Sequence, residues 1–348
     1  MCDDDATSVQ AAAPRPAPGP AVDPVSLTPV DEVVITVLMD NTFDALLAGD
    51  ERVIRPSTRN GLVEAPQFEG GLTTASLRGE HGFSALVRVR RGQKVTTLLF
   101  DTGVSPDGIV SNADRLGVDL GEIQGVVLSH GHFDHVGGLA GLAGRRGVHG
   151  LPMTVHPLIW TRRRLAPPGL EPTELPTLSR RALESEGFAV IERRDPSLLV
   201  DGSVLITGEV DRTTDFERGM PPPHQAWDGS GWSHDPRVLD DQALVVHVRD
   251  QGLVVLTGCG HAGAVNIARH ARRLTGVDRL HALVGGLHLS GGAFEPVIAP
   301  TVAALTDLAP DLVASAHCTG WRAQHALASA LPAAWVPSSS GTSFRLAA

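Results

Sequence analysis

The stretch SHGHFDHVGGL, residues 129–139, places three histidines and one aspartate within six positions, at His130, His132, Asp134 and His135. Imidazole nitrogens and carboxylate oxygens are ligands that zinc and similar divalent metals accept readily. In an irregular turn, the first two histidines can point at one ion, and Asp134 with His135 can reach a second ion beside it. Because the stretch directly follows the apolar run GVVL, we interpret it as a metal-binding turn rather than as an exposed histidine-rich loop.

A metal ion needs more ligands than this turn supplies, and three further histidines occur in a similar setting. His261 lies in LTGCGHAG, His288 in VGGLHLSGG and His317 in ASAHCTG, each after an apolar run and beside small residues. Functional side chains concentrate in such strand-end loops. We therefore predict His261 and His317 as metal ligands, and His288 as a catalytic residue that protonates a leaving group or holds a phosphate. Other histidines lack this setting and are interpreted as structural: His149, His156, His224, His234, His270 and His325.

Polar residues near other strand ends are predicted to support this site or to contact a substrate. Asp101, in FDTG, is expected to accept a hydrogen bond from a ligand histidine and fix its tautomer, although an aspartate there could instead cap the next turn. His81 and Asn41 are candidates for substrate contacts, with an ordinary structural position as the alternative. Arg212 either binds a substrate phosphate or carboxylate through its planar guanidinium or pairs with a neighbouring acid.

The elements that must position these residues follow from the hydrophobic pattern. Helices are predicted at 111–123, 136–146, 264–275, 301–310 and 321–332, and strands at 33–40, 125–129, 153–160, 281–289 and 311–317, with hairpins at 82–100 and 243–257. The first half is mostly hairpins and the second half alternates strand and helix, which favours an α/β sandwich over a barrel.

The same pass along the chain predicts its domain organisation. Residues 1–31, rich in Ala, Pro and Asp, are expected to form a disordered tail. Residues 32–348 are expected to form a single domain with an irregular, Pro- and Gly-rich insertion at about 161–240. Insertions of this length are usually lids, binding loops or contact surfaces, so a role as a lid and a role in self-association both stay open.

Composition narrows the classes of protein to be considered. The 348 residues carry a formal net charge of −10, which argues against a general nucleic-acid or anionic-membrane surface. Only three cysteines are present, so a disulfide framework is not expected and a reducing compartment fits. No stretch resembles a signal peptide or a membrane span. We expect a cytoplasmic protein whose partner is a small-molecule substrate, with a homo-oligomer left open.

The motifs resemble those of the metallo-β-lactamase fold superfamily, whose signature is HxHxDH after a strand. Within it, the chain is similar to a branch of 7,8-dihydropterin-6-methyl-4-(β-D-ribofuranosyl)aminobenzene-5′-phosphate synthase-like proteins. The matching stretches span about residues 33–345: HGFSALV, LLFDTG, LSHGHFDHVGGL, TGEVDRTTDFE, DDQALVV, LTGCGHAGAVNI, VGGLHL and AHCTG. The resemblance implies an αββα sandwich of two mixed β-sheets flanked by helices. It also implies two divalent metal ions, zinc first, with iron or manganese as alternatives.

Two departures from the wider superfamily concern the ligands. Many members carry a third histidine before the second hairpin, where this chain reads LDDQA, and a bridging aspartate after the hairpin strand, where this chain has a Gly-Cys step. His261 is therefore expected to take over as a ligand, and Asp240 or Asp241 could replace the carboxylate. Cys259 and Cys318 are interpreted first as small packing residues, with ligation by a thiolate as the alternative.

A binuclear site of this kind suits hydrolysis of a phosphoester, thioester, lactone or amide. We expect a hydrolase that uses a metal-bound hydroxide on a small anionic, phosphoester- or pterin-like substrate, with Asp134 and His288 as catalytic residues. The branch implies as an alternative a synthase-type condensation in pterin or methanopterin-like metabolism. A metal-dependent binding or sensor protein with little turnover, and redox chemistry at iron, also stay open. No G-x-S-x-G elbow, dinucleotide-binding fingerprint or P-loop is found, which argues against those classes of enzyme.

Overall fold

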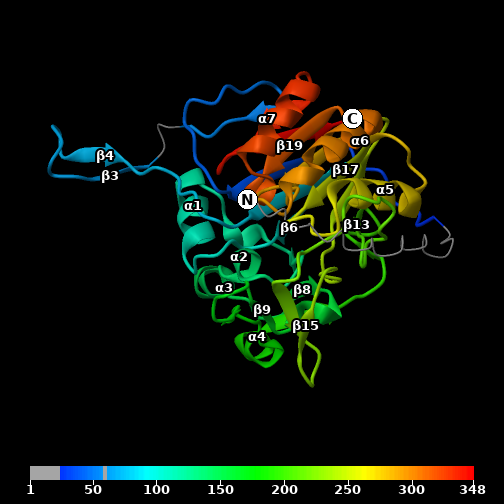
Figure 1. Ribbon diagram of the computed structural model, residues 1–348. Coiled ribbons are helices and arrows are strands. Elements are labelled where there is room, and N and C mark those ends of the chain that lie inside the picture. The colour runs from blue at the N-terminus through cyan, green and yellow to red at the C-terminus, as the bar shows by residue number, and fades with distance from the viewer. Residues whose placement is uncertain (1–23, 58–60) are drawn as a thin grey trace, which may run out of the picture.

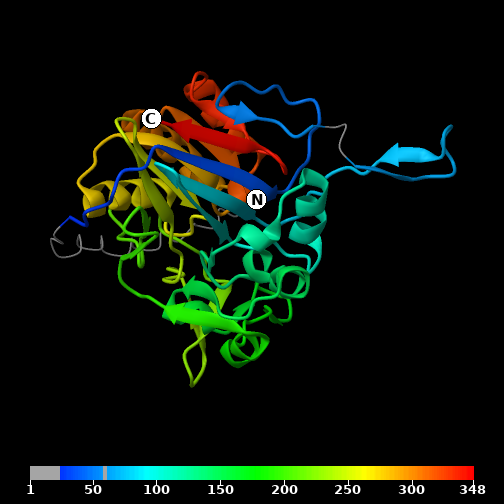
Figure 2. The ribbon, with the colours of Figure 1, turned by 180° about the vertical axis from the view of Figure 1, so that it is seen from behind.

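The computed structural model describes residues 24–57 and 61–348, and within them two large β-sheets pack face to face (Figures 1 and 2). The first sheet has the order β11-β8-β7-β6-β5-β1-β21-β2. Its strands are β1 Glu32–Met39, β2 Val53–Ile54, β5 Ser84–Arg91, β6 Lys94–Phe100, β7 Gly125–Val127, β8 Leu151–Val155, β11 Phe188–Glu192 and β21 Ser343–Ala347. The second sheet has the order β12-β13-β16-β17-β18-β19-β20. Its strands are β12 Ser197–Leu199, β13 Val204–Ile206, β16 Leu244–Val248, β17 Gly252–Thr257, β18 Leu280–Gly286, β19 Leu312–Ala316 and β20 Trp335–Pro337.

Both predicted hairpins form, and each opens into a parallel half-sheet. β5 pairs antiparallel with β6, and β16 pairs antiparallel with β17. The second hairpin turns at Asp250, whose φ of 59° is left-handed. Beyond the hairpins, β6, β7, β8 and β11 run parallel, as do β17, β18, β19 and β20. Parallel neighbours end at the same edge of a sheet, so each half-sheet presents a row of strand-end loops.

Helices cover the outer faces of both sheets, which completes the predicted αββα sandwich (Figure 1). Apolar side chains of both sheets meet in the central core, where Phe100 and Leu256 are fully buried. The first sheet is covered by α1 Gly108–Leu116, α2 Phe133–Val136, α3 Leu139–Arg146 and α4 Arg180–Glu186. The second is covered by α5 Ala264–Thr275, α6 Ile298–Leu308 and α7 Trp321–Ala330. Short 3₁₀ turns complete the set, at η1 Leu120–Glu122, η2 Pro157–Trp160, η3 Glu295–Val297 and η4 His317–Thr319.

The segment predicted as an irregular insertion at about 161–240 has more regular structure than expected. It contributes α4, β11, β12 and β13, and the last three extend the two large sheets. It also forms a separate four-stranded sheet, called the small sheet here, with the order β10-β9-β14-β15. Its strands are β9 Arg163–Leu165, β10 Thr173–Glu174, β14 His224–Trp227 and β15 Trp232–His234. These strands are too short and too Pro- and Gly-rich for the alternating pattern that marks a strand in sequence.

The N-terminal boundary also differs from the prediction. Residues 1–23 of the predicted tail lie outside the described residues. Residues 24–31 pack on the domain: Leu27 is buried, the Val25 amide donates to the Leu274 carbonyl at 2.6 Å, and Val30 forms a bridge with Val248. The apolar residues in this stretch are too widely spaced to give a periodic signal. The folded chain therefore includes residues that the sequence assigned to the tail.

A two-stranded ribbon projects from the body, formed by β3 Leu62–Glu64 and β4 Leu72–Thr74 (Figure 1, left). The sequence analysis assigned no element to this region. Over the described ranges, no helix combines the length and apolar character needed to cross a bilayer.

Candidate metal centre

The predicted site residues arrive at one place because the strand ends of both sheets meet there. Asp101 follows β6, and the turn at residues 129–135 follows β7. From the second sheet, residues 259–261 follow β17, His288 follows β18, and His317 follows β19. Ligands of α/β proteins bind at the carboxyl ends of parallel strands, and this centre uses those ends in both sheets.

The first candidate ligand group consists of His130, His132 and His261. The Nε2 atom of His130 lies 3.0 Å from Nδ1 of His132, and Nε2 of His261 lies 3.1 Å from each of those two nitrogens. All three side chains are at most 8% exposed. Three imidazole nitrogens converging on one point are a donor set that fits a divalent metal such as zinc.

The far side of the His130 ring determines which nitrogen faces this group. The Ser129 hydroxyl lies 2.6 Å from Oδ2 of Asp101 and 2.9 Å from Nδ1 of His130. Its one proton goes to the carboxylate, so the hydroxyl oxygen accepts from Nδ1–H of His130. The Nε2 atom of His130 is therefore left with its lone pair directed at the other two histidines. Outer contacts of this kind usually fix the tautomer of metal-bound histidines.

The protonation states of these histidines suit ligation. Burial, reinforced by neighbouring histidines, lowers the pKa of His130 and of His261 well below the usual value. Burial and the nearby Arg163 do the same for the pKa of His132. Neutral imidazole is the form that binds metals, so all three are ready to bind at neutral pH.

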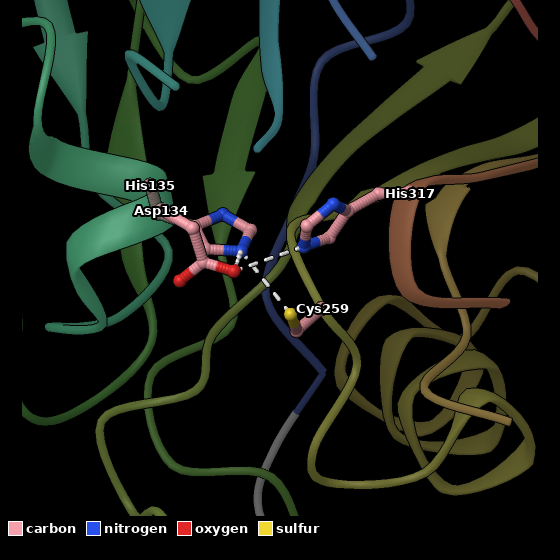
Figure 3. Close-up of side chains that lie close together, drawn as sticks. All are labelled: Asp134, His135, Cys259 and His317. Carbon is pink, nitrogen blue, oxygen red and sulfur yellow. Dashed lines mark hydrogen bonds and ion pairs between the residues drawn. The ribbon is translucent and has the colours of Figure 1, made fainter. Parts of the chain in front are cut away.

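The second candidate group consists of Asp134, His135, Cys259 and His317 (Figure 3). The Oδ2 atom of Asp134 lies 3.3 Å from Nε2 of His317 and 3.9 Å from Nε2 of His135. That His135 nitrogen lies 3.1 Å from the sulfur of Cys259. All four residues are buried, and one carboxylate, one sulfur and two imidazoles are a donor set that fits zinc or iron.

Outer contacts orient the two histidines of the second group as well. Asp101 Oδ2 lies 2.7 Å from Nδ1 of His135, so the contact expected between Asp101 and a predicted ligand is present. Asn41, predicted to contact the substrate, instead contacts His317: its Oδ1 lies 3.0 Å from Nδ1 of His317 and its Nδ2 donates to the His317 carbonyl at 3.1 Å. Asp101 and His317 have φ angles of 57° and 47°, and left-handed backbone at non-glycine residues concentrates at functional sites.

The electrostatics of the second group favour a positive charge. Burial lowers the pKa of His135, but the carboxylates of Asp101 and Asp134 outweigh burial and raise it to about 9. Burial raises the pKa of Asp134, but His135 and His317 outweigh burial and hold it well below its usual range. The aspartate therefore stays ionised at neutral pH. An anionic pocket that stabilises a proton on His135 would also stabilise a metal cation in its place.

Cys259 belongs to both groups, whereas the sequence analysis interpreted it first as a packing residue. Its sulfur lies within 4.8 Å of the donor atoms of either set. Gly258 explains how it gets there: a Cβ at that position would lie 2.1 Å from the Ser129 hydroxyl and 2.7 Å from Asp101 Oδ2. Only glycine lets the chain pass so close to these two side chains. The Gly-Cys step thus directs a sulfur to the point where the superfamily usually has an aspartate.

His288 and His81 lie at the edge of the centre. The ring of His288 lies 4.2 Å from that of His261 and 4.4 Å from that of Phe294. Its Nδ1 is buried and lacks a hydrogen-bond partner among the described residues. His81 is mainly exposed, with Nε2 at 3.6 Å from Asp134 Oδ2. Both positions are compatible with contact to a substrate, as predicted for them.

Three charged residues support the loops rather than the ions. Arg212 donates from Nη1 to the His261 carbonyl at 2.9 Å, so it pairs neither with an acid nor with a site open to substrate. Asp241 Oδ2 accepts from the Ala262 amide at 2.8 Å, and burial raises the pKa of Asp241 to about 6. Asp240 accepts from the Gly131 amide at 2.8 Å. Among the described residues, neither aspartate belongs to a ligand group, so the suggestion that one replaces the bridging carboxylate is wrong.

The sequence analysis missed His224, which it interpreted as structural. His224 begins β14 of the small sheet, and its Nε2 lies 3.0 Å from Nε2 of His132. In sequence it follows MPPP and precedes QAW, without the apolar run and glycines that marked the other histidines. No signal in the sequence could have separated it from His156 or His270.

Comparison with known proteins agrees with this geometry. The family model of the metallo-β-lactamase superfamily matches residues 77–239. A 7,8-dihydropterin-6-methyl-4-(β-D-ribofuranosyl)-aminobenzene-5′-phosphate synthase of Methanocaldococcus jannaschii is 27% identical over 248 residues, which cover 71% of this chain and 83% of the relative. An uncharacterized protein of the same organism is 26% identical over 61% of this chain and 74% of that protein.

A solved structure supports the fold over a longer range than the family model. The crystal structure of Tm1679, described as a metal-dependent hydrolase of the β-lactamase superfamily, superposes with a TM-score of 0.65 at 23% identity. The match covers 91% of this chain and all of that one, so it includes the strands that carry His261, His288 and His317. With its αββα sandwich and its HxHxDH turn at the end of β7, the chain belongs to the metallo-β-lactamase superfamily.

Proposed function

We propose that the protein is a metal-dependent hydrolase acting on a small anionic substrate of the phosphoester or pterin-like class. The observation that carries the proposal is the convergence of two ligand groups on the shared sulfur of Cys259. Membership of a superfamily whose members are generally hydrolases supports the reaction type. Zinc is proposed as the metal, with iron or manganese as alternatives that the same donors accept.

Divalent ions in these groups would supply an acidified water and polarise a substrate oxygen. The chain's own residues do the rest. Ser129, Asp101 and Asn41 direct the ligand nitrogens inward. His288, whose buried Nδ1 has no partner in the described part of the chain, is placed to give a proton to a leaving group or to hold an anionic oxygen.

A pocket of about 520 Å³ beside the centre is the proposed substrate site. His261 and His288 form its inner wall, and Phe294 and Leu289 give it apolar surface. Arg218, which is exposed, stands at the same pocket and can present its planar guanidinium to an anion. This lining suits a molecule with one anionic group and an apolar or aromatic part.

The test is a turnover screen with metal-loaded and chelator-treated protein. Phosphodiesters, phosphomonoesters, thioesters and lactones are offered in turn. We expect turnover of at least one phosphoester, loss of that turnover on metal removal, and recovery when zinc or manganese is added back. A preparation that holds two equivalents of metal and turns over none of these classes would contradict the proposal.

Replacing His288 with asparagine is expected to lower kcat by roughly 10²-fold or more, because proton transfer by a positioned side chain contributes about 10²–10⁴-fold. Metal content should not change, since His288 lies outside the two groups described above. The matched variant is His81→Asn, on the exposed side of the centre. Full kcat in His288→Asn, with metal content confirmed, would remove this residue from the reaction.

A second candidate function is a synthase-type condensation of pterin metabolism, favoured by the name of the relative from M. jannaschii. The same pocket and ions could activate a leaving group on a pterin-like substrate without admitting water. Incubation with a pterin donor and a phosphorylated ribofuranosyl-aminobenzene acceptor, followed by mass spectrometry, separates the two. A condensed product favours the synthase, and hydrolysed donor alone favours the hydrolase.

A further inference from the structure

The small sheet reaches the metal-binding turn through one buried side chain, that of His224. It is 1% exposed, and its ring lies 5.2 Å from that of His132, edge to face. The two Nε2 atoms are 3.0 Å apart, which is a hydrogen-bond distance. His132 uses its other nitrogen, Nδ1, in the first ligand group. His224 therefore contacts the back of a candidate ligand.

The direction of this hydrogen bond follows from the other end of His224. Its Nδ1 lies 3.0 Å from the backbone carbonyl of Asp235, which can only accept, so Nδ1 carries the proton. In a neutral ring, Nε2 is then an acceptor. The proton between the two rings must belong to Nε2 of His132. That tautomer leaves Nδ1 of His132 bare, facing His130 and His261.

A second contact ties the same turn to the small sheet. Arg163, on β9, is 3% exposed and donates to both Asp235 and Asp240. Asp240 in turn accepts the Gly131 amide, between the two ligand histidines, at 2.8 Å. Because Asp235 also accepts from His224, the guanidinium links both supports into one network.

The sheet that carries these residues has contacts of its own that make it a firm support. The Arg162 guanidinium lies over the rings of Trp227 and Trp232, at 5.4 and 5.3 Å, and Arg164 lies over Trp232 at 4.6 Å. Such cation–π contacts each stabilise a surface hairpin by about 0.5–1 kcal/mol.

We propose that His224 is a positioning residue that fixes the metal-binding tautomer of His132, and that the small sheet serves to hold the metal-binding turn. This inference rests on the metal site of the proposed function but needs no substrate. The segment at 161–240 is then neither only a lid nor only a contact surface. One of its strands supplies the outer hydrogen bond of a ligand.

The experiment compares three variants of the full chain. His224→Leu removes the acceptor and keeps the bulk, and His224→Gln places an amide oxygen near the position of Nε2. His234→Leu removes an exposed imidazole from β15 of the same sheet and serves as the control. Zinc affinity is measured by competition with a chromophoric chelator. The His132 tautomer is read in the metal-free protein from long-range ¹H–¹⁵N NMR correlations.

We expect His224→Leu to weaken binding of one zinc ion by about 10–100-fold, the usual effect of losing an outer contact to a ligand. His224→Gln should stay within a few-fold of the native chain, and His234→Leu should match it. The native chain should show His132 protonated at Nε2, and His224→Leu should show a mixture of tautomers. Equal losses in the Leu and Gln variants, or an unchanged tautomer in His224→Leu, would overturn the inference. If the native chain bound no metal, the proposed function would fail while the tautomer measurement would still decide the role of His224.

Discussion

Replacing Asp134 with alanine is expected to remove one of two bound metal ions and to leave the other. Asp134 is the carboxylate of the second group, and its pKa, held low by His135 and His317, keeps it ionised. The first group has no atom of Asp134, so His130, His132 and His261 should still bind. Loss of an ion that acts as a Lewis acid removes several kcal/mol of transition-state stabilisation, or about 10³-fold in rate. Metal content by mass spectrometry and kcat on the best substrate of the screen check both parts.

The control for this substitution is Asp107→Ala, which removes an exposed carboxylate paired with Arg78 on the surface. It should keep both ions and the full rate. His317→Ala should behave like Asp134→Ala, because its Nε2 faces the same Oδ2 atom at 3.3 Å. If Asp134→Ala and His317→Ala both kept full metal content, the model with two ions would fail.

Replacing Cys259 with alanine is expected to weaken the binding of both ions, unlike any other single substitution at the centre. The sulfur of Cys259 is the donor that the two groups share. Burial raises the pKa of this thiol well above its usual value, so a bound cation is what would draw its proton off. We expect each ion to bind at least about 100-fold more weakly, beyond the usual effect of an outer contact. Cobalt-loaded protein should lose its thiolate-to-metal charge-transfer band.

Two further variants make this result specific. Cys259→Asp, which restores the carboxylate usual in the superfamily, should keep two ions without the thiolate band. Cys318→Ala removes a second buried thiol, which donates to the Cys259 carbonyl at 3.3 Å but lies outside the two groups. It should keep both ions and the band. A native charge-transfer band that survives in Cys259→Ala and disappears in Cys318→Ala would assign the sulfur ligand to the wrong cysteine here.

The main sheets could be predicted because their strands are long and strongly apolar. β1, β5, β17 and β18 are buried almost throughout, and their pattern of β-branched residues gave the strands within a few residues. The site residues at their carboxyl ends followed from the same signal. His261 and His317 stand next to such strands, so their position in sequence already indicated their position in space.

The parts that could not be predicted depend on contacts between distant segments. His224 and Arg163 have a role only because β14 and β9 pair and pack against the metal-binding turn, and neither strand has a periodic pattern. Cys259 was underestimated because a lone cysteine carries no sign of what surrounds it. The structure adds that sign through Gly258, whose missing side chain leaves room for Asp101 and Ser129.

The most direct test of the central claim is a crystal structure of the protein as purified, with anomalous diffraction recorded at metal absorption edges. Two anomalous peaks are predicted, one bound by His130, His132 and His261 and the other by Asp134, His135 and His317. Both should contact the sulfur of Cys259. A single peak, or two peaks of which neither touches His261 or Cys259, would contradict the account of two ligand groups joined by a shared thiolate.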